Sequence, residues 1–145
     1  MKTQYMAAFI AASLLFLNGC AATTAQRAEP KTAMACSVGD PMMKTTLFFG
    51  LNRPSGPVIS AQEWQRFVDQ QVTPRFKEGL SVFDDKVQWL GNDGKLAREN
   101  SKALMLIHPA GKDTEANIEA LRTLYKQKCA QDAVMREDAQ VCVAF

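Results

Sequence analysis

One histidine and four cysteines limit the chemistry that this chain can perform. Any Ser-His-Asp or Cys-His arrangement would have to use His108. Ser101 lies at an odd offset on the same predicted strand, so the two side chains point to opposite faces, and there is no Gly-x-Ser-x-Gly elbow. No pair of Cys or His residues has the spacing of metal ligands. We therefore expect no catalytic nucleophile, no metal and no cofactor, and we interpret His108 as a strand-end histidine.

Adjacent carboxylates and a glycine-containing turn are equally weak signals. Asp84 and Asp85 are neighbours, so in an extended chain their side chains diverge and cannot work as an acid and base pair. We interpret them as a solvated bulge that breaks a strand. Residues 91–94 lack the lysine and the following helix of a phosphate-binding loop, so we expect a plain hairpin turn there.

Five residues remain as candidates for binding a ligand or partner: Arg75, Trp89, Arg98, Glu99 and Lys102. A planar guanidinium near an aromatic ring can recognise a carboxylate or a phosphate. Trp89 and Arg98 flank the predicted hairpin and could meet across it. In the alternative interpretation, Arg98 and Glu99 pair with cross-strand neighbours and Arg75 caps the end of a helix.

The N-terminus has the pattern of an export signal. Lys2 precedes an apolar run over residues 6–17, which is too short to cross a bilayer and is typical of a secretory signal peptide. Residues 17–20, Leu-Asn-Gly-Cys, resemble the lipobox of bacterial lipoproteins, in which the cysteine carries acyl chains such as palmitate. The resemblance implies a signal peptide at residues 1–19 and lipid attachment at Cys20. The alternative is an ordinary signal peptide that ends at this cysteine.

The rest of the chain divides into a tether and one domain. Ala21 after the cysteine implies, by the lipoprotein sorting pattern, the outer membrane, so we expect a lipid-anchored protein on its periplasmic side. Residues 20–43 are expected to be the lipidated N-terminus and a flexible tether, and residues 44–145 a single domain, because 145 residues leave no room for a second. A net charge of +2 is too even for a nucleic-acid partner.

Six elements are expected in the domain. A strand over residues 45–51 precedes a helix that starts at the capping box Ser60-Ala61-Gln62-Glu63 and ends at Thr73-Pro74. Strands follow over residues 80–90 and up to residue 107, then a helix capped by Asp113 or Thr114, and a last strand over residues 134–145. This order predicts an α+β fold, the ferredoxin-like βαββαβ sandwich, with a four-stranded antiparallel sheet and two helices on one face.

The two central strands of such a sheet are apolar on both faces. Phe48 alternates with Leu47 and Phe49, and residues 103–107 are apolar without a break. Two helices cover one face only, so a partner chain, an apolar ligand or the N-terminal segment must cover the other. We hypothesise that the domain forms a homodimer through this open sheet face.

The predicted topology also indicates which cysteines can form a disulfide. Cys142 near the end of the last strand should lie beside Cys36 at the start of the first strand, because these strands are antiparallel. Cys129, at the end of the second helix, should lie at the opposite pole as a buried or idle thiol. We therefore predict a Cys36–Cys142 disulfide, with Cys129–Cys142 as the competing pair.

Several separated motifs resemble a bacterial family of domains of unknown function, the one numbered three-five-seven-four. They are Leu47-Phe48-Phe49-Gly50-Leu51, Glu63-Trp64 with Phe67, Val72-Thr73-Pro74-Arg75-Phe76, Gly79-Leu80, Gln88-Trp89, Arg98-Glu99, Ser101-Lys102 and Val141-Cys142-Val143-Ala144-Phe145. The resemblance covers residues 44–145 and implies secreted or lipid-anchored bacterial proteins, without implying a reaction.

The sequence thus favours a lipid-anchored periplasmic module that acts by binding or assembly, with the membrane as one partner and an envelope protein or small ligand as another. The sequence does not distinguish such a module from an envelope stress factor or an envelope assembly factor. The alternative is a small cofactor-free enzyme of the dimeric α/β-barrel type, which would use the open sheet face with Glu99 or His108 as base.

Overall fold

The computed structural model describes residues 34–91 and 93–145. Its elements are β1 (Asp40–Gly50), α1 (Ala61–Phe67), η1 (Val68–Val72), β2 (Ser81–Leu90), β3 (Leu96–His108), α2 (Lys112–Cys129) and β4 (Met135–Val143). The strands form one antiparallel sheet in the order β2-β3-β1-β4. This is the predicted ferredoxin-like arrangement, with β1 and β3 in the centre and the charged strands β2 and β4 at the edges, where charges discourage further strand pairing.

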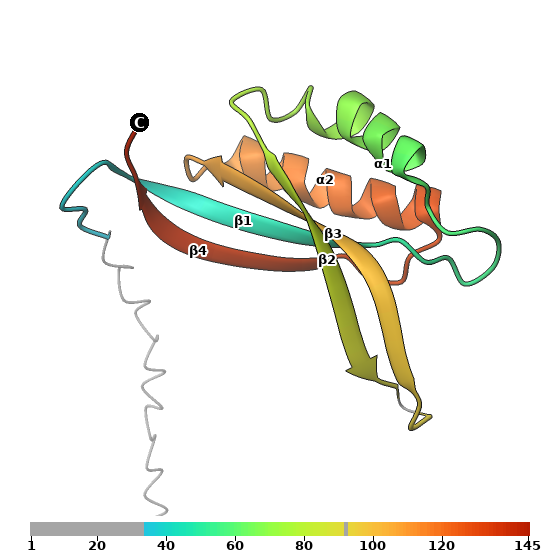
Figure 1. Cartoon of the computed structure of the whole chain (residues 1–145). Helices are drawn as coiled ribbons and strands as arrows, with labels where there is room; N and C mark the ends of the chain where they lie inside the picture. The colour runs from blue at the N-terminus through green and yellow to red at the C-terminus, as the bar shows by residue number, and fades with distance from the viewer. Residues whose placement is uncertain (1–33, 92) are drawn as a thin grey trace, which may run out of the picture. The chain divides into compact units, whose positions relative to one another are not determined.

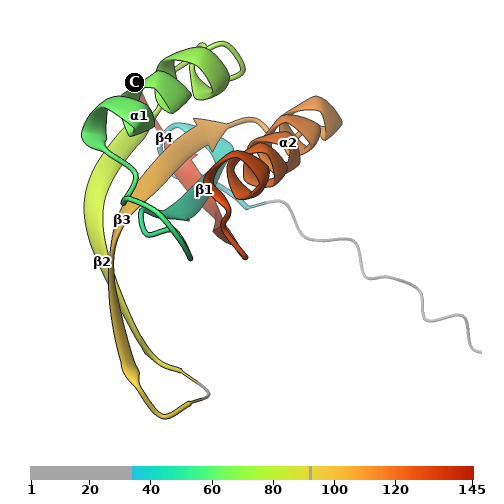
Figure 2. The ribbon, with the colours of Figure 1, turned by 90° about the vertical axis from the view of Figure 1, so that its right-hand side faces the viewer.

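The helices lie on one face of the sheet, as Figures 1 and 2 show. Leu47 and Phe49 of β1, with Leu104 and Leu106 of β3, point from the sheet into this layer and are at most 1% exposed. Phe49 is the centre of an aromatic cluster, with its ring 4.7 Å from the ring of Tyr125. The cluster is completed by rings from the first helix, Trp64 and Phe67. The core therefore holds both helices against the two central strands.

The first helix begins as the capping box predicts. The Ser60 hydroxyl accepts a hydrogen bond from the Glu63 amide at 3.2 Å. The Glu63 carboxylate does not reach back to Ser60 but pairs with Arg53 in the preceding loop. The last turn, η1, is a π-helical turn closed by a bond from the Thr73 amide to the Val68 carbonyl at 2.9 Å. η1 ends at Val72, close to the predicted end, but the predicted reason is wrong: Thr73 before Pro74 keeps helical backbone angles, φ −52° and ψ −42°. The chain makes one further turn, in which the Phe76 amide donates to the Val72 carbonyl at 3.1 Å.

Three predicted boundaries are corrected by the structure. β1 begins at Asp40, so residues 40–43 of the predicted tether belong to the sheet and pair with β4. The expected bulge at Asp84-Asp85 is wrong, because β2 pairs with β3 in one unbroken register and Lys102 on the facing strand neutralises Asp84. α2 begins at Lys112 after Gly111 with no side-chain cap, rather than at a cap of Asp113 or Thr114.

The β2–β3 hairpin extends beyond the rest of the sheet as an arm. The β1 ladder reaches β3 only from Ser101 onward, so residues 96–100 have ladder partners in β2 alone. Figures 1 and 2 show this arm projecting away from the helices. The arm therefore exposes both of its faces.

The disulfide prediction is confirmed. Cys36 and Cys142 are joined, with Cα atoms 5.6 Å apart, and Cys129 is a free, buried thiol. The competing pairing of Cys129 with Cys142 is excluded, because these residues lie in different parts of the domain. The bridge ties the segment before β1 to the end of the edge strand β4.

Candidate functional site

The five predicted binding residues do not form one site. Arg75 lies after the first helix, where its Nη1 donates to the Gln71 carbonyl at 2.5 Å. This is the helix-capping alternative that the sequence left open. The other four residues, Trp89, Arg98, Glu99 and Lys102, lie on the β2–β3 hairpin.

On the hairpin, the register separates the tryptophan from the arginine. Trp89 is opposite Ala97, whereas Arg98 is opposite Gln88 and donates from Nε to its Oε1 at 2.9 Å. Because adjacent residues of a strand point to opposite faces, Trp89 and Arg98 do not meet. Trp89 is 46% exposed on the face away from the helices.

The acidic member of the set has a backbone partner. Glu99 Oε1 accepts a hydrogen bond from the amide of Asn52, which follows β1, at 2.7 Å. Arg98 and Glu99 line an open recess of about 460 Å³ along the arm. Each candidate on the hairpin except Trp89 thus has a local hydrogen-bond or ion-pair partner, as the alternative interpretation expected for Arg98 and Glu99.

His108 belongs to a buried chain of hydrogen bonds. The Thr45 hydroxyl, itself 0% exposed, donates its single proton to Asp138 Oδ1 at 2.6 Å. It must then accept at its other contact, which is His108 Nε2 at 2.9 Å. His108 Nδ1 faces the carbonyl oxygen of Pro109 at 2.9 Å, which can only accept. Both ring nitrogens thus face hydrogen-bonding partners within the domain, and His108 is 6% exposed.

Asp138 also belongs to an ion-pair network around Arg136, which extends to the surface of α2. The guanidinium, 14% exposed, bonds Glu115, Glu119 and Asp138. The hydrogen bond from Arg136 lowers the pKa of Glu115, and that from Arg122 lowers the pKa of Glu119. Burial would raise the pKa of Asp138, but hydrogen bonds from Thr45 and Arg136 outweigh burial and lower it. These are features of a structural ion-pair network that joins β4 to α2.

The open sheet face presents large apolar side chains. The register places on it Phe48, Phe83, Trp89, Met105, Ile107 and Met135. Phe83 is 52% exposed and Met135 is 58% exposed. Apolar side chains thus occur on both faces of the central strands, as the sequence predicts, although Lys44 and Thr46 of β1 also lie on this face. The described part of the chain leaves its largest edge residues, Phe83 and Met135, exposed.

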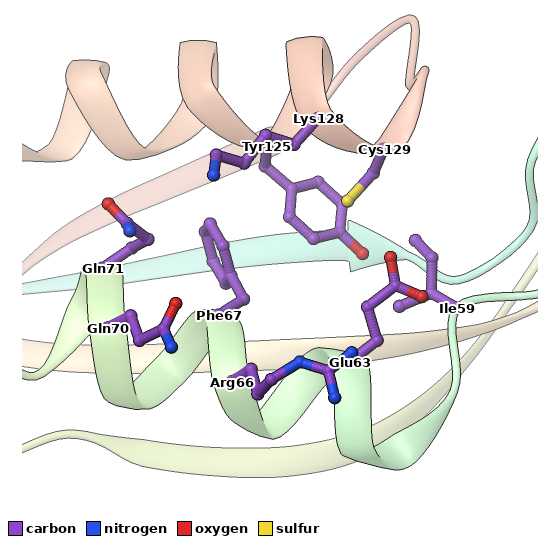
Figure 3. A pocket seen from close by; sticks show the side chains of 9 residues that line it. All are labelled: Ile59, Glu63, Arg66, Phe67, Gln70, Gln71, Tyr125, Lys128 and Cys129. Carbon is purple, nitrogen blue, oxygen red and sulfur yellow. The ribbon is translucent and has the colours of Figure 1, made fainter.

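A cleft between the two helices was missed by the sequence analysis. It measures about 320 Å³ and is lined by Ile59, Glu63, Arg66, Phe67, Gln70, Gln71, Tyr125, Lys128 and Cys129. Figure 3 shows Arg66, Gln70 and Gln71 extending from the first helix and Lys128 from α2, with the rings of Phe67 and Tyr125 between them. No sequence signal joins Arg66 to Lys128, because they approach only when the two helices pack.

Comparison with known proteins identifies the family. A family model described as a protein of unknown function, DUF3574, matches residues 44–145. The chain belongs to this family. The match confirms the resemblance over the same residues, and no curated protein matches the chain.

Solved structures with similar folds come from other kinds of protein. A phage SAM lyase in complex with S-methyl-5'-thioadenosine is 16% identical, with a TM-score of 0.52 over 76% of the DUF3574 chain and 95% of the lyase. The same lyase in its apo state is 16% identical, with a TM-score of 0.53 over 77% and 98% of the two chains. CutA from Synechococcus elongatus is 11% identical, with a TM-score of 0.48 over 72% and 81%. At 16% identity the likeness to the lyase shows the fold alone.

Two further observations concern membranes and metals. Within residues 34–91 and 93–145, no helix of the DUF3574 chain combines the length and the apolarity needed to cross a membrane. In the same residues, no three His, Cys, Asp or Glu side chains gather in a way that could hold a metal ion. The predicted signal peptide and Cys20 lie outside the described residues.

Proposed function

We propose that this DUF3574 protein is a lipoprotein, anchored through Cys20 on the periplasmic side of the outer membrane, that acts as a binding or assembly module. Its open sheet face binds a second copy of the chain. The observation that carries this proposal is the set of large apolar side chains on the face that the helices leave uncovered, with Phe83, Trp89 and Met135 each 46% or more exposed.

Export is supported by two independent features. The N-terminal sequence has a lipobox-like end, and the domain contains the Cys36–Cys142 disulfide. Disulfides persist in oxidising compartments such as the bacterial periplasm and are rare in the cytosol. A bridge that closes most of the domain therefore agrees with a protein that folds after export.

The open face is comparable in size to one side of a stable interface. Its four strands are at least nine residues long and stand about 4.8 Å apart, which makes a face on the order of 600 Å² in projection. A standard interface buries about 800 Å² of accessible surface on each partner. Part of this face is apolar, and a contiguous exposed apolar patch of a few hundred Å² commonly marks an interaction site.

Two features of the sequence favour a second copy of the chain as the partner of the open face. Residues 21–33 contain no apolar side chain larger than alanine or proline, so this segment has little to bury against the face. The face itself carries both signs of charge, with Lys44 on β1 and Glu137 on the neighbouring edge strand. In a two-fold pair, the lysine of one copy can face the carboxylate of the other.

The lipid anchor is tested by metabolic labelling. Bacteria that produce the full chain are grown with labelled palmitate, and Cys20→Ala is the matched variant. We expect label on the wild-type protein in the outer-membrane fraction and none on the variant. An unlabelled wild-type protein would remove the anchor from the proposal.

Self-association is tested separately by photo-crosslinking the full chain in intact cells. A photoreactive residue at Thr46, on the open face, should give a crosslinked dimer, and one at Thr123, on the outer surface of α2, should not. Phe83→Asp should abolish the dimer, because it places a charge in the interface. Val58→Asp is the control, since Val58 is 63% exposed in a loop away from the sheet. Crosslinking only to other envelope proteins would replace the second copy with a different partner.

A further inference from the structure

The helix cleft has a chemistry that the proposed self-association does not use. The cleft is lined by residues of the helix layer. The helices lie on the side of the sheet opposite to the open face (Figure 2). A dimer formed through the open face would leave the cleft accessible. Its volume, about 320 Å³, is at the small end of the range for ligand sites.

The floor of the cleft is apolar. Phe67 and Tyr125 pack edge to face, with ring centroids 5.1 Å apart, and Ile59 closes one end. Tyr125 lies beneath the floor, 0% exposed, and its hydroxyl already donates its proton to the Gly50 carbonyl at 2.8 Å. The accessible apolar atoms of the floor therefore belong mainly to Phe67, which is 8% exposed. Burial raises the pKa of the Cys129 thiol, which keeps the thiol neutral. The floor therefore favours an apolar group.

The rim of the cleft is cationic. Glu63 is neutralised by its ion pair with Arg53. Arg66 on α1 and Lys128 on α2 have no ion-pair partner among the residues that the structure describes. The amide side chains of Gln70 and Gln71 add hydrogen-bond donors beside them. The rim therefore presents two positive charges and neutral donors above the apolar floor.

We propose that this cleft binds an amphiphilic organic anion, with its apolar body over Phe67 and its carboxylate or phosphate head between Arg66 and Lys128. The volume corresponds to a body of about ten non-hydrogen atoms, at about 30 Å³ for each water-sized group. Cations are repelled by the rim. An uncharged chain of the same length gains only the floor contacts and leaves the rim charges unpaired.

The proposal is tested by NMR shift titration of the full chain carrying Cys20→Ser, which removes the predicted lipid. The probes are octanoate, octyl phosphate, 1-octanol and inorganic phosphate. We expect at least one of the two octyl anions to shift the signals of the cleft residues with a Kd on the order of 1 mM, as fits a ligand of this size. 1-Octanol and inorganic phosphate should each bind at least tenfold more weakly. The stronger of the two octyl anions identifies the head group.

Charge variants separate the rim from the general charge of the helix. Arg66→Gln and Lys128→Gln should each weaken binding of the preferred octyl anion about two- to fivefold. Lys126→Gln is the matched control, because it removes a charge from the same helix turn without lining the cleft. A second readout is the rate at which a thiol reagent modifies Cys129, which the bound anion should slow. Binding of octanol as tight as that of the anions, shifts confined to the open sheet face, or equal effects of all three substitutions would overturn the proposal.

Discussion

Removing the Cys36–Cys142 bridge should cost the domain a large part of its stability. The bridge joins residues 106 apart in the sequence, so it restricts mainly the unfolded chain. The chain-entropy relation for a loop of this length gives about 4.8 kcal/mol at 25 °C. Cys142 sits in the β1–β4 ladder opposite Pro41, and the ladder keeps its hydrogen bonds without the bridge. We therefore expect a measured loss of about 2–4 kcal/mol, below the ideal value.

The assay is urea unfolding of the full chain, comparing wild type with the double variant Cys36→Ser/Cys142→Ser. The midpoint should fall by about 1–2 M, since such domains unfold with slopes of about 1–3 kcal/mol per molar urea. The slope itself should rise, because an unfolded chain without the bridge exposes more surface. Reductant should lower the wild-type midpoint to that of the double variant and leave the variant unchanged.

Single variants provide the control. Because either substitution breaks the same bond, Cys36→Ser and Cys142→Ser should each destabilise the domain as much as the double variant does. Losses that add up to that of the double variant would mean that the two side chains act separately. A double variant within about 1 kcal/mol of wild type would also refute the reasoning, because the cross-link would then not restrict the unfolded chain.

Three further substitutions test other parts of the domain. Arg136→Met removes the cation shared by three carboxylates and should cost about 1–3 kcal/mol at pH 7 in urea unfolding. The pKa values of these three carboxyls are lowered in the folded state. The stabilisation that they contribute is therefore complete above about pH 5 and is lost as the pH falls through the lowered values. The unfolding free energy of the variant should consequently depend less on pH in the acid range. Tyr125→Phe loses the bond to the Gly50 carbonyl and should lower stability by about 1 kcal/mol in thermal unfolding. Gly39→Ala should lower stability by about 1–3 kcal/mol in the same assay, because Gly39 has φ +75° and an added Cβ would overlap the backbone of β4. Gly56→Ala is the control: Gly56 has φ +95°, but its Cβ would point into open space, so the loss should be smaller.

Local patterns carried most of the fold prediction. Ser60 caps the first helix because a hydroxyl at that position can accept an amide that the helix leaves unpaired. The unbroken apolar run over residues 103–107 marks a central strand because only a strand buried between neighbours tolerates such a run. The disulfide followed from strand direction, which brings Cys36 to Cys142 once the topology is known.

Errors arose where a local pattern had a partner far along the chain. Asp84 and Asp85 look like a strand break, but Lys102 on β3 compensates the charge and the ladder continues. The predicted meeting of Trp89 and Arg98 failed because the register of the hairpin differs by one residue from the one that would bring them together, and one residue moves a side chain to the other face.

The sequence alone determined the order of the elements and which strands are central, because periodicity and strand direction are properties of the chain read in order. It favoured the Cys36–Cys142 bridge but left Cys129–Cys142 as a competing pair, which the structure excluded. The open apolar face was also visible in the alternation of Phe48 with its neighbours. Only the tertiary structure decided the helix cleft. Arg66 and Lys128 belong to helices whose rotation on the sheet is set by how Phe49, Phe67 and Tyr125 pack, and such packing depends on the shapes of side chains from all three elements at once.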